Sequence, residues 1–213
     1  MGKAYFITAT GTDLGKTWLT AGLLAAWRAR GVAARALKPV MSGHDPARHA
    51  ESDAAIIGAR PTTWTYAAPL SPDLAAAKEG KAIDFDALVD WCRDAIASSD
   101  GLLLIEGIGG TMVPLDARHT VRDWIAALNV PALLVCGSHL GALSHALTAL
   151  AALREAGVVP AALVVNESAG SAVSLDDTLA SLRPHVGAVP VIALRRDDAA
   201  GLGRLAELLI SSQ

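Results

Sequence analysis

Short, continuously apolar runs alternate with amphipathic patterns along the chain. A continuously apolar run is typical of a strand covered on both faces, whereas apolar residues repeating every three or four positions predict a helix. The predicted strands cover residues 4–8, 32–40, 102–105, 132–136, 161–165 and 189–193. The predicted helices cover residues 17–30, 52–57, 84–97, 121–129, 140–156, 175–182 and 202–210, with a short helix after Pro72 and loops at 41–51 and 60–73.

This regular alternation predicts an α/β fold in three layers, with a mostly parallel sheet and helices on both of its faces. A chain of 213 residues is long enough for one domain with a substantial core. No internal repeat, linker or low-complexity segment interrupts the pattern. We therefore expect residues 1–213 to form a single domain.

The first predicted strand leads through a glycine-containing turn directly into a helix. The turn, ATGTDLGKT at residues 9–17, ends in Gly-Lys-Thr and has the layout of a phosphate-binding loop. Backbone N–H groups and the positive end of the helix dipole would bind the phosphates, Lys16 would reach the terminal ones, and the Thr17 hydroxyl would contact Mg²⁺. The usual spacing needs glycine where this chain has Thr10. The simpler alternative is a glycine turn followed by an exposed lysine.

Polar residues also follow three of the later strands. Lys38 comes at the end of the second predicted strand, Glu106 follows residues 102–105, and Asn166 follows residues 161–165. The carboxyl ends of parallel strands lie at one edge of the sheet, where open α/β sheets bind ligands. We therefore expect these side chains to gather beside the phosphate loop.

Four residues suggest phosphate chemistry. Lys16 and Lys38 could both face phosphate oxygens, because neighbouring ammonium groups repel unless an anion lies between them. Glu106 matches the acidic residue that helps to hold Mg²⁺ in phosphate-loop enzymes. Lys38 could instead be a solvated strand end, and Glu106 a turn or capping carboxylate. Asp53 could be a second Mg²⁺ ligand or an acid favoured by a helix dipole. The residues indicate a magnesium–nucleotide enzyme or switch.

Composition excludes several other classes of protein. The net charge is −3 and no basic stripe is present, which argues against nonspecific binding to nucleic acid or to an anionic membrane. No apolar run predicts a membrane span and the first residues do not form a signal peptide, so we expect a cytoplasmic protein. Cys92 and Cys136 lie in apolar patterns and are predicted to be core residues in a reducing compartment.

Several sequence blocks, taken together, resemble the dethiobiotin synthetase family. They are TDLGKT at residues 12–17, KPVMSG at 38–43, SD at 52–53, PLSP at 69–72, EGIGG at 106–110, PL at 114–115, LGALSHA at 140–146 and VN at 165–166. The blocks cover nearly the whole chain, in order and at compatible spacing. The combination of KPVMSG with the variant phosphate loop is specific, whereas either block alone would only be suggestive.

The resemblance implies a fold like that of the P-loop NTPases and an ATP- and Mg²⁺-dependent ring closure in biotin biosynthesis. The family joins CO₂ to 7,8-diaminononanoate and releases dethiobiotin, ADP and phosphate. One amine of the substrate becomes a carbamate, and the carbamate oxygen takes the γ-phosphoryl group of ATP. The second amine then attacks the mixed anhydride and expels phosphate. The family is a homodimer, in which the substrate carboxylate reaches the partner subunit at the start of the helix near Gly141.

The resemblance also implies roles for individual residues. Lys16 and Lys38 would be catalytic. The Mg²⁺ ligands would be Thr17, Asp53 and Glu106. The substrate would be bound by Thr12, Ser42, Gly141, Ala142 and Ser144. The ATP site would comprise Asp13, Leu14, Gly15, Lys16, Thr17, Trp18, Asp53, Glu106, Gly107, Ile108, Gly109, Asn166, Glu167, Pro190, Val191 and Ile192, with Asn166 and the backbone of 190–192 contacting adenine.

Three positions depart from the family pattern. Ala9 replaces a common glycine, Asp13 is shorter than the usual glutamate, and Asp73 stands where histidine is frequent. A regulatory ATPase switch of the same broad fold would carry a signature lysine at position 11, and Gly11 argues against that alternative. An amide-forming cobyrinate synthase would need a far longer chain. A nucleotide-binding module without catalysis would not need both lysines together with Glu106.

Overall fold

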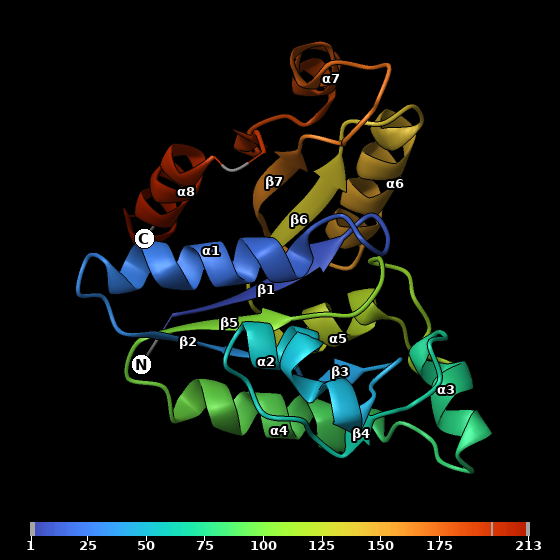
Figure 1. Cartoon of the computed structure of the whole chain (residues 1–213). Coiled ribbons are helices and arrows are strands. Elements are labelled where there is room, and N and C mark those ends of the chain that lie inside the picture. Colours follow the sequence, from blue (N-terminus) through green and yellow to red (C-terminus); the bar gives the residue numbers. More distant parts are fainter. Residues whose placement is uncertain (1–2, 197, 212–213) are drawn as a thin grey trace.

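A computed structural model describes residues 3–196 and 198–211 of the chain. Its main sheet has six strands in the order β2-β5-β1-β6-β7-β8 (Figure 1). Every neighbouring pair in this sheet is parallel, which confirms the predicted α/β class. The strands are β1 (Ala4–Ala9), β2 (Ala34–Leu37), β5 (Leu102–Glu106), β6 (Ala132–Gly137), β7 (Pro160–Asn166) and β8 (Val191–Leu194).

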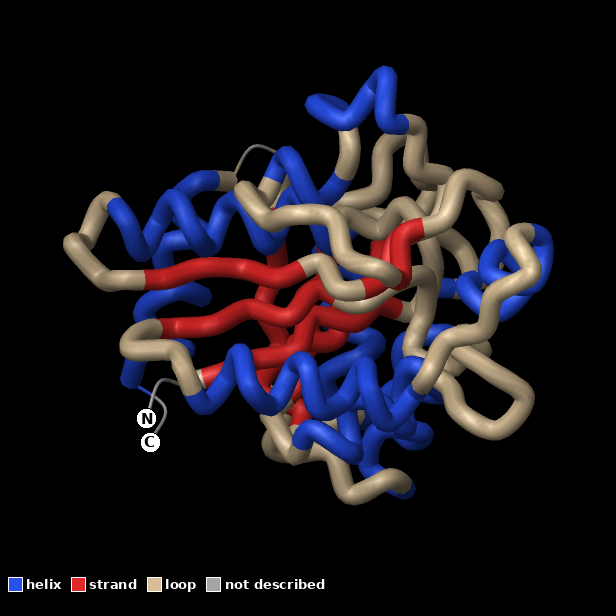
Figure 2. The backbone as a smooth tube through the Cα atoms, turned by 90° about the horizontal axis from the view of Figure 1, so that it is seen from below, coloured by secondary structure: helices blue, strands red, loops and turns tan. Residues whose placement is uncertain are grey.

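Helices cover both faces of this sheet (Figure 2). Helices α1 (Lys16–Arg28) and α8 (Ala199–Ser211) pack on one face, whereas α4 (Phe85–Ala97), α5 (Val121–Leu128), α6 (Ala142–Glu155) and α7 (Leu175–Leu182) pack on the other. Shorter elements are α2 (Asp53–Ile56), α3 (Pro72–Lys78) and the 3₁₀ helices η1 (Pro46–Glu51) and η2 (Arg183–His185). No helix within residues 3–196 and 198–211 is both long and apolar enough to cross a membrane.

The central strand β1 contributes to both cores because successive side chains of a strand point to opposite faces. Tyr5 and Ile7 belong to the core under α1 and α8, whereas Phe6 belongs to the opposite core. There the Phe6 ring meets the edge of Trp124, with ring centroids 4.8 Å apart. All residues of β1 are buried, so the apolar run in the sequence reflects a strand covered on both sides.

Both cysteines are buried and free, as predicted for core residues. Burial raises the pKa of the Cys136 thiol to about 12. Burial also raises the pKa of the Cys92 thiol to about 12. Neither thiol therefore has the thiolate character that a nucleophile or metal ligand needs near neutral pH.

The predicted strand at 32–40 is wrong in one respect, because the chain leaves the main sheet after Leu37. Lys38 and Pro39 form the break, and Pro39 has no N–H with which to continue the ladder. The next residues form β3 (Val40–Met41), which pairs in parallel with β4 (Trp64–Thr65) as a separate two-stranded sheet. The predicted loop at 41–51 likewise contains η1, which the Asp45 side chain caps at its start.

Candidate active site

The phosphate-type loop joins the end of β1 to the start of α1 and has a constrained backbone. Gly15 precedes the helix with φ 91°, and an added Cβ atom would lie only 2.6 Å from Nδ2 of Asn166. Only glycine suits this position. Asp13 also has a positive φ, of 57°, which is rare for a residue with a side chain. Gly11 has no such requirement, since the nearest atom to an added Cβ would be 3.7 Å away. The displaced glycine is therefore not needed for the loop conformation.

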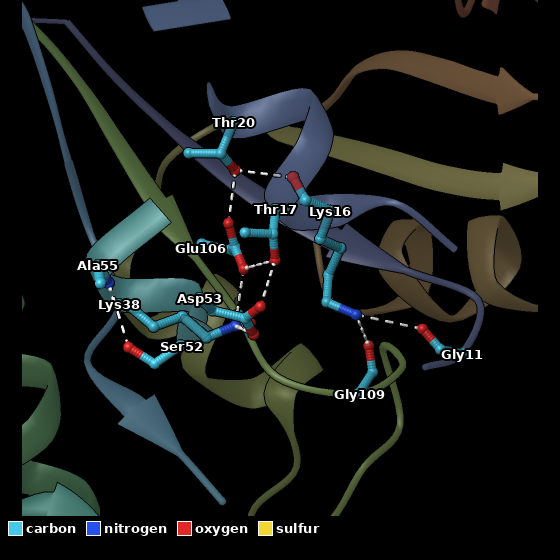
Figure 3. Close-up of polar contacts among 11 residues, drawn as sticks. Gly11, Lys16, Thr17, Thr20, Lys38, Ser52, Asp53, Ala55, Glu106 and Gly109 are labelled. Carbon is cyan, nitrogen blue, oxygen red and sulfur yellow. Dashed lines mark hydrogen bonds and ion pairs between the residues drawn. The ribbon is translucent and has the colours of Figure 1, made fainter. Parts of the chain in front are cut away.

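Lys16 is buried at the first residue of α1 and points back across the loop (Figure 3). Its Nζ atom donates to the carbonyl oxygens of Gly109 at 2.8 Å and Gly11 at 3.2 Å. Burial and then the neighbouring Lys38 ammonium lower the pKa of Lys16 from 10.5 to about 8. A bound anion would favour the charged form of such a lysine.

Lys38 lies directly after β2 and is buried against acidic groups. Its Nζ atom is 2.7 Å from Oε1 of Glu106, 3.2 Å from Oδ2 of Asp53, and 2.8 Å from the carbonyl oxygen of Gly107. The Glu106 side chain is completely buried, whereas that of Asp53 is 48% exposed. The two carboxylates and the Gly107 carbonyl therefore hold the Lys38 ammonium in place and balance its charge, so Lys38 is not a solvated strand end.

The predicted metal ligands converge at the same place (Figure 3). Oγ1 of Thr17 lies 2.8 Å from Oδ1 of Asp53 and 2.9 Å from Oε1 of Glu106. Burial raises the pKa of Asp53, but Lys38 and the Thr17 hydroxyl outweigh it and hold this pKa below its ordinary value. Asp53 begins α2, whose cap is the Ser52 hydroxyl accepting from the N–H of Ala55, so the predicted helix start is confirmed.

This donor set fits Mg²⁺. Magnesium prefers oxygen ligands and commonly uses one or two carboxylates together with substrate phosphates. Among residues 3–196 and 198–211, no cluster of three His, Cys, Asp or Glu side chains could hold a metal by itself. An ion here would therefore depend on Thr17, Asp53, Glu106 and the phosphates of a ligand.

A cleft of about 840 Å³ opens over these groups. The phosphate loop, the segments after β2 and β3, and the start of α3 (Pro72–Lys78) form its walls. Both lysines line it, as do the predicted substrate residues Thr12 and Ser42 and the predicted nucleotide residues Ile108 and Gly109. Glu106 and Gly107 do not line the cleft, but both accept hydrogen bonds from Lys38, which does.

A second pocket of about 590 Å³ adjoins the first, because Asp13 and Gly15 line both. Nδ2 of Asn166 donates to the Leu14 carbonyl at 2.7 Å. The Oδ1 atom of Asn166 is buried and accepts no hydrogen bond within the described part of the chain. The side chain thus offers a free acceptor beside the phosphate loop. The other predicted nucleotide residues in this lining are Leu14, Trp18 and Glu167.

Two predicted groups lie elsewhere. Pro190 and residues 191–192 line neither pocket, because they stand at the beginning of β8. The carboxyl end of that strand lines the second pocket instead, with Leu194, Arg195 and Arg196. Gly141, Ala142 and Ser144 also line neither pocket; they form the start of α6, where Gly141 has φ 94°. Their proposed contact with a partner's substrate stays a prediction.

One residue of the site, Thr20, belongs to no sequence motif. Thr20 lies on α1, and its Oγ1 atom is 2.7 Å from Oε2 of Glu106. It is completely buried among apolar neighbours such as Leu19 and Leu23. A hydroxyl on the apolar face of a predicted helix is the signal that could have identified it, because buried polar groups need partners.

Comparisons with known proteins identify the relatives of this chain. A family model described as an AAA domain matches residues 3–195. The ATP-dependent dethiobiotin synthetase BioD of Acidiphilium cryptum is 47% identical over 199 residues, with 87% of this chain and 89% of the relative covered. The protein with the same description from Caulobacter vibrioides is 43% identical over 219 residues, covering 98% of this chain and 100% of the relative.

Solved structures share the fold. The hydrogenase maturation factor HypB from Archaeoglobus fulgidus aligns with a TM-score of 0.61 and 14% identity, covering 98% of this chain and 89% of that one. The cell division ATPase MinD of Pyrococcus furiosus aligns with a TM-score of 0.61 and 20% identity, and 99% of each chain is covered. These likenesses place the chain in the P-loop NTPase fold.

Proposed function

The chain belongs to the dethiobiotin synthetase family, whose members are ATP-dependent ligases of biotin biosynthesis, and we propose that it closes the urea ring of dethiobiotin. The substrates would be 7,8-diaminononanoate, CO₂ and ATP, and the products dethiobiotin, ADP and phosphate. The observation that carries this proposal is the pair of buried lysines, Lys16 and Lys38, on the wall of one cleft. A transferring phosphoryl group and a carbamate are both anionic, so their approach requires such positive charge.

The phosphate loop would hold the triphosphate through the N–H groups at residues 13–18. Lys16 would exchange its contacts with the Gly11 and Gly109 carbonyls for contacts with phosphate oxygens. Mg²⁺, held by Thr17, Asp53 and Glu106, would neutralise charge on the phosphates. The free Oδ1 of Asn166 can accept from the amino group of adenine, which supports a base site in the second pocket.

Thr12 and Ser42 would orient the diamine and its carbamate at the cleft wall. The carbamate oxygen attacks the γ-phosphorus, and the bond to ADP breaks. Lys38 would face the negative charge that spreads over the transferring group. The second amine then attacks the carbonyl carbon of the mixed anhydride, the ring closes, and phosphate leaves. The substrate carboxylate would bind a partner subunit at residues 141–144 in a homodimer.

The test is an assay of the purified protein with ATP, Mg²⁺ and bicarbonate, with and without the diamine. We expect phosphate release only when the diamine is present, together with dethiobiotin detected by mass spectrometry. ATP hydrolysis that does not depend on the diamine and is stimulated by a protein partner would instead support the regulatory switch. Sedimentation of the protein with and without the diamine would test the homodimer separately.

A further inference from the structure

The two oxygens of the Glu106 carboxylate have different partners (Figure 3). Oε1 receives the Lys38 ammonium at 2.7 Å and lies 2.9 Å from the Thr17 hydroxyl. Oε2 lies 2.7 Å from the hydroxyl of Thr20. Because the carboxylate is completely buried, protein groups must satisfy both oxygens.

The Thr20 hydroxyl has one proton and two acceptors within reach. These are Oε2 of Glu106 at 2.7 Å and the Lys16 carbonyl at 2.9 Å, one helical turn earlier. A carboxylate is the stronger acceptor, and O–H···O⁻ bonds are characteristically short. The Lys16 carbonyl, in contrast, already accepts a hydrogen bond from the backbone N–H four residues later, as every carbonyl within an α-helix does. The Thr20 hydroxyl therefore donates its proton in a hydrogen bond to Oε2 of Glu106.

We propose that Thr20 is a positioning residue, which fixes the plane of the Glu106 carboxylate so that Oε1 faces Lys38 and Thr17. The last torsion of a glutamate side chain is broad and roughly twofold, so packing alone does not fix that plane. The ammonium holds one oxygen and the hydroxyl holds the other. Thr20 lies on α1, which begins with the last residues of the phosphate loop, Lys16 and Thr17, so the contact also ties this helix to the end of β5. The inference rests on the proposed function only for the identity of the reaction.

The variant Thr20→Val removes the hydroxyl at nearly constant volume, whereas Thr20→Ser retains it. Loss of a group that orients a metal ligand typically weakens metal affinity by about 10- to 100-fold. We expect that loss in Thr20→Val when Mn²⁺ binding to the protein–ADP complex is measured by electron paramagnetic resonance. Thr20→Ser should restore wild-type affinity. In turnover assays of Thr20→Val, the Mg²⁺ concentration that gives half-maximal activity should rise, while the KM for the diamine stays unchanged.

Thr178 on α7 offers a matched control. It is buried, and its hydroxyl donates to the carbonyl of Ser174 at 2.9 Å, as Thr20 could to Lys16, but within the described residues this hydroxyl makes no hydrogen bond to a carboxylate. Thr178→Val therefore removes an equivalent buried hydroxyl away from the cleft. We expect unchanged Mn²⁺ affinity in this variant, even if its thermal unfolding temperature falls.

The outcomes separate the two proposals, because Mn²⁺ binding with ADP needs neither diamine nor turnover. Wild-type affinity in Thr20→Val, an equal loss in Thr178→Val, or no Mn²⁺ binding by the wild type would each overturn the positioning role. If Thr20→Val does not fold, Thr20→Ala takes its place, and affinities equal to Thr20→Ser would overturn the role. A selective loss in Thr20→Val, in a protein without diamine-dependent turnover, would uphold Thr20 while refuting the ring closure.

Discussion

The buried ion pair between Lys38 and Glu106 should be strongly coupled in the stability of the protein. The atoms Nζ and Oε1 are 2.7 Å apart, and both side chains are almost fully buried. At an effective dielectric constant of about 20 this separation corresponds to a gross attraction of about 6 kcal/mol. Most of that attraction offsets the desolvation of the two charges, so the pair itself adds little. Breaking it, in contrast, leaves one charge buried without its partner, which costs about 3 to 5 kcal/mol.

Lys38→Met and Glu106→Gln remove the two charges with little change in volume. Lys38→Met should cost more, because it leaves Glu106 with hydroxyl groups only. Glu106→Gln leaves Lys38 in contact with Asp53, whose carboxylate is partly exposed. For a chain of this size, a loss of about 3 to 5 kcal/mol lowers Tm by about 6 to 20 °C. The double variant should be much more stable than the sum of the single effects indicates.

The assay is a double-mutant cycle of thermal and urea unfolding, without nucleotide and with a chelator. The surface pair Arg30–Glu207, with side chains 37% and 64% exposed, is the control and should show a coupling within about 1 kcal/mol. Additive effects at Lys38 and Glu106 would refute the reasoning. So would a larger loss in Glu106→Gln than in Lys38→Met.

Three other outcomes are expected at the cleft. Lys38→Ala should lower turnover by orders of magnitude while ATP affinity, measured by calorimetry, stays close to the wild type; unchanged turnover contradicts its assignment. Because the pKa of Lys16 is lowered to about 8, its charge is present below this pH and is lost above it. ATP affinity should therefore fall between pH 8 and about 10, and a constant affinity contradicts this. Gly15→Ala places a Cβ 2.6 Å from Asn166, so it should abolish ATP binding with the circular dichroism spectrum retained.

The centre of the main sheet could be predicted because β1, β5 and β6 are buried on both faces and are therefore almost continuously apolar in sequence. The small sheet of β3 and β4 could not, since strands of two residues show no periodicity. The apolar pattern also continues across the break at Lys38 and Pro39, where the chain changes sheets. Apolar character records burial and does not show which sheet a residue joins: Leu37 and Val40, on either side of the break, pack in the same core although their strands belong to different sheets.

The carboxyl-end rule brought Lys16, Lys38 and Glu106 to one site from positions far apart in the sequence. The same rule, applied to the last strand, would have indicated residues 194–196, which line the second pocket, whereas residues 190–192 do not. Thr20 has no comparable signal in a motif, because its partner lies 86 residues away and is found only through packing. Contacts of this kind depend on the side-chain geometry of the folded protein.

The position of the second lysine explains how one fold can serve a ligase. A lysine at position 11 would project from the phosphate loop itself, whereas Lys38 comes from the neighbouring strand β2 and is held by Glu106 and Asp53. In the folded chain the two lysines are thus balanced by the two carboxylates that would bind Mg²⁺. Mg²⁺ held by these carboxylates would balance their charge, and Lys38 would then be available to an anion at the cleft wall. Thr12 and Ser42 line the same cleft as Lys38. The ammonium of Lys38 would there stabilise a negatively charged phosphoryl acceptor, such as the proposed carbamate, as it approaches the triphosphate.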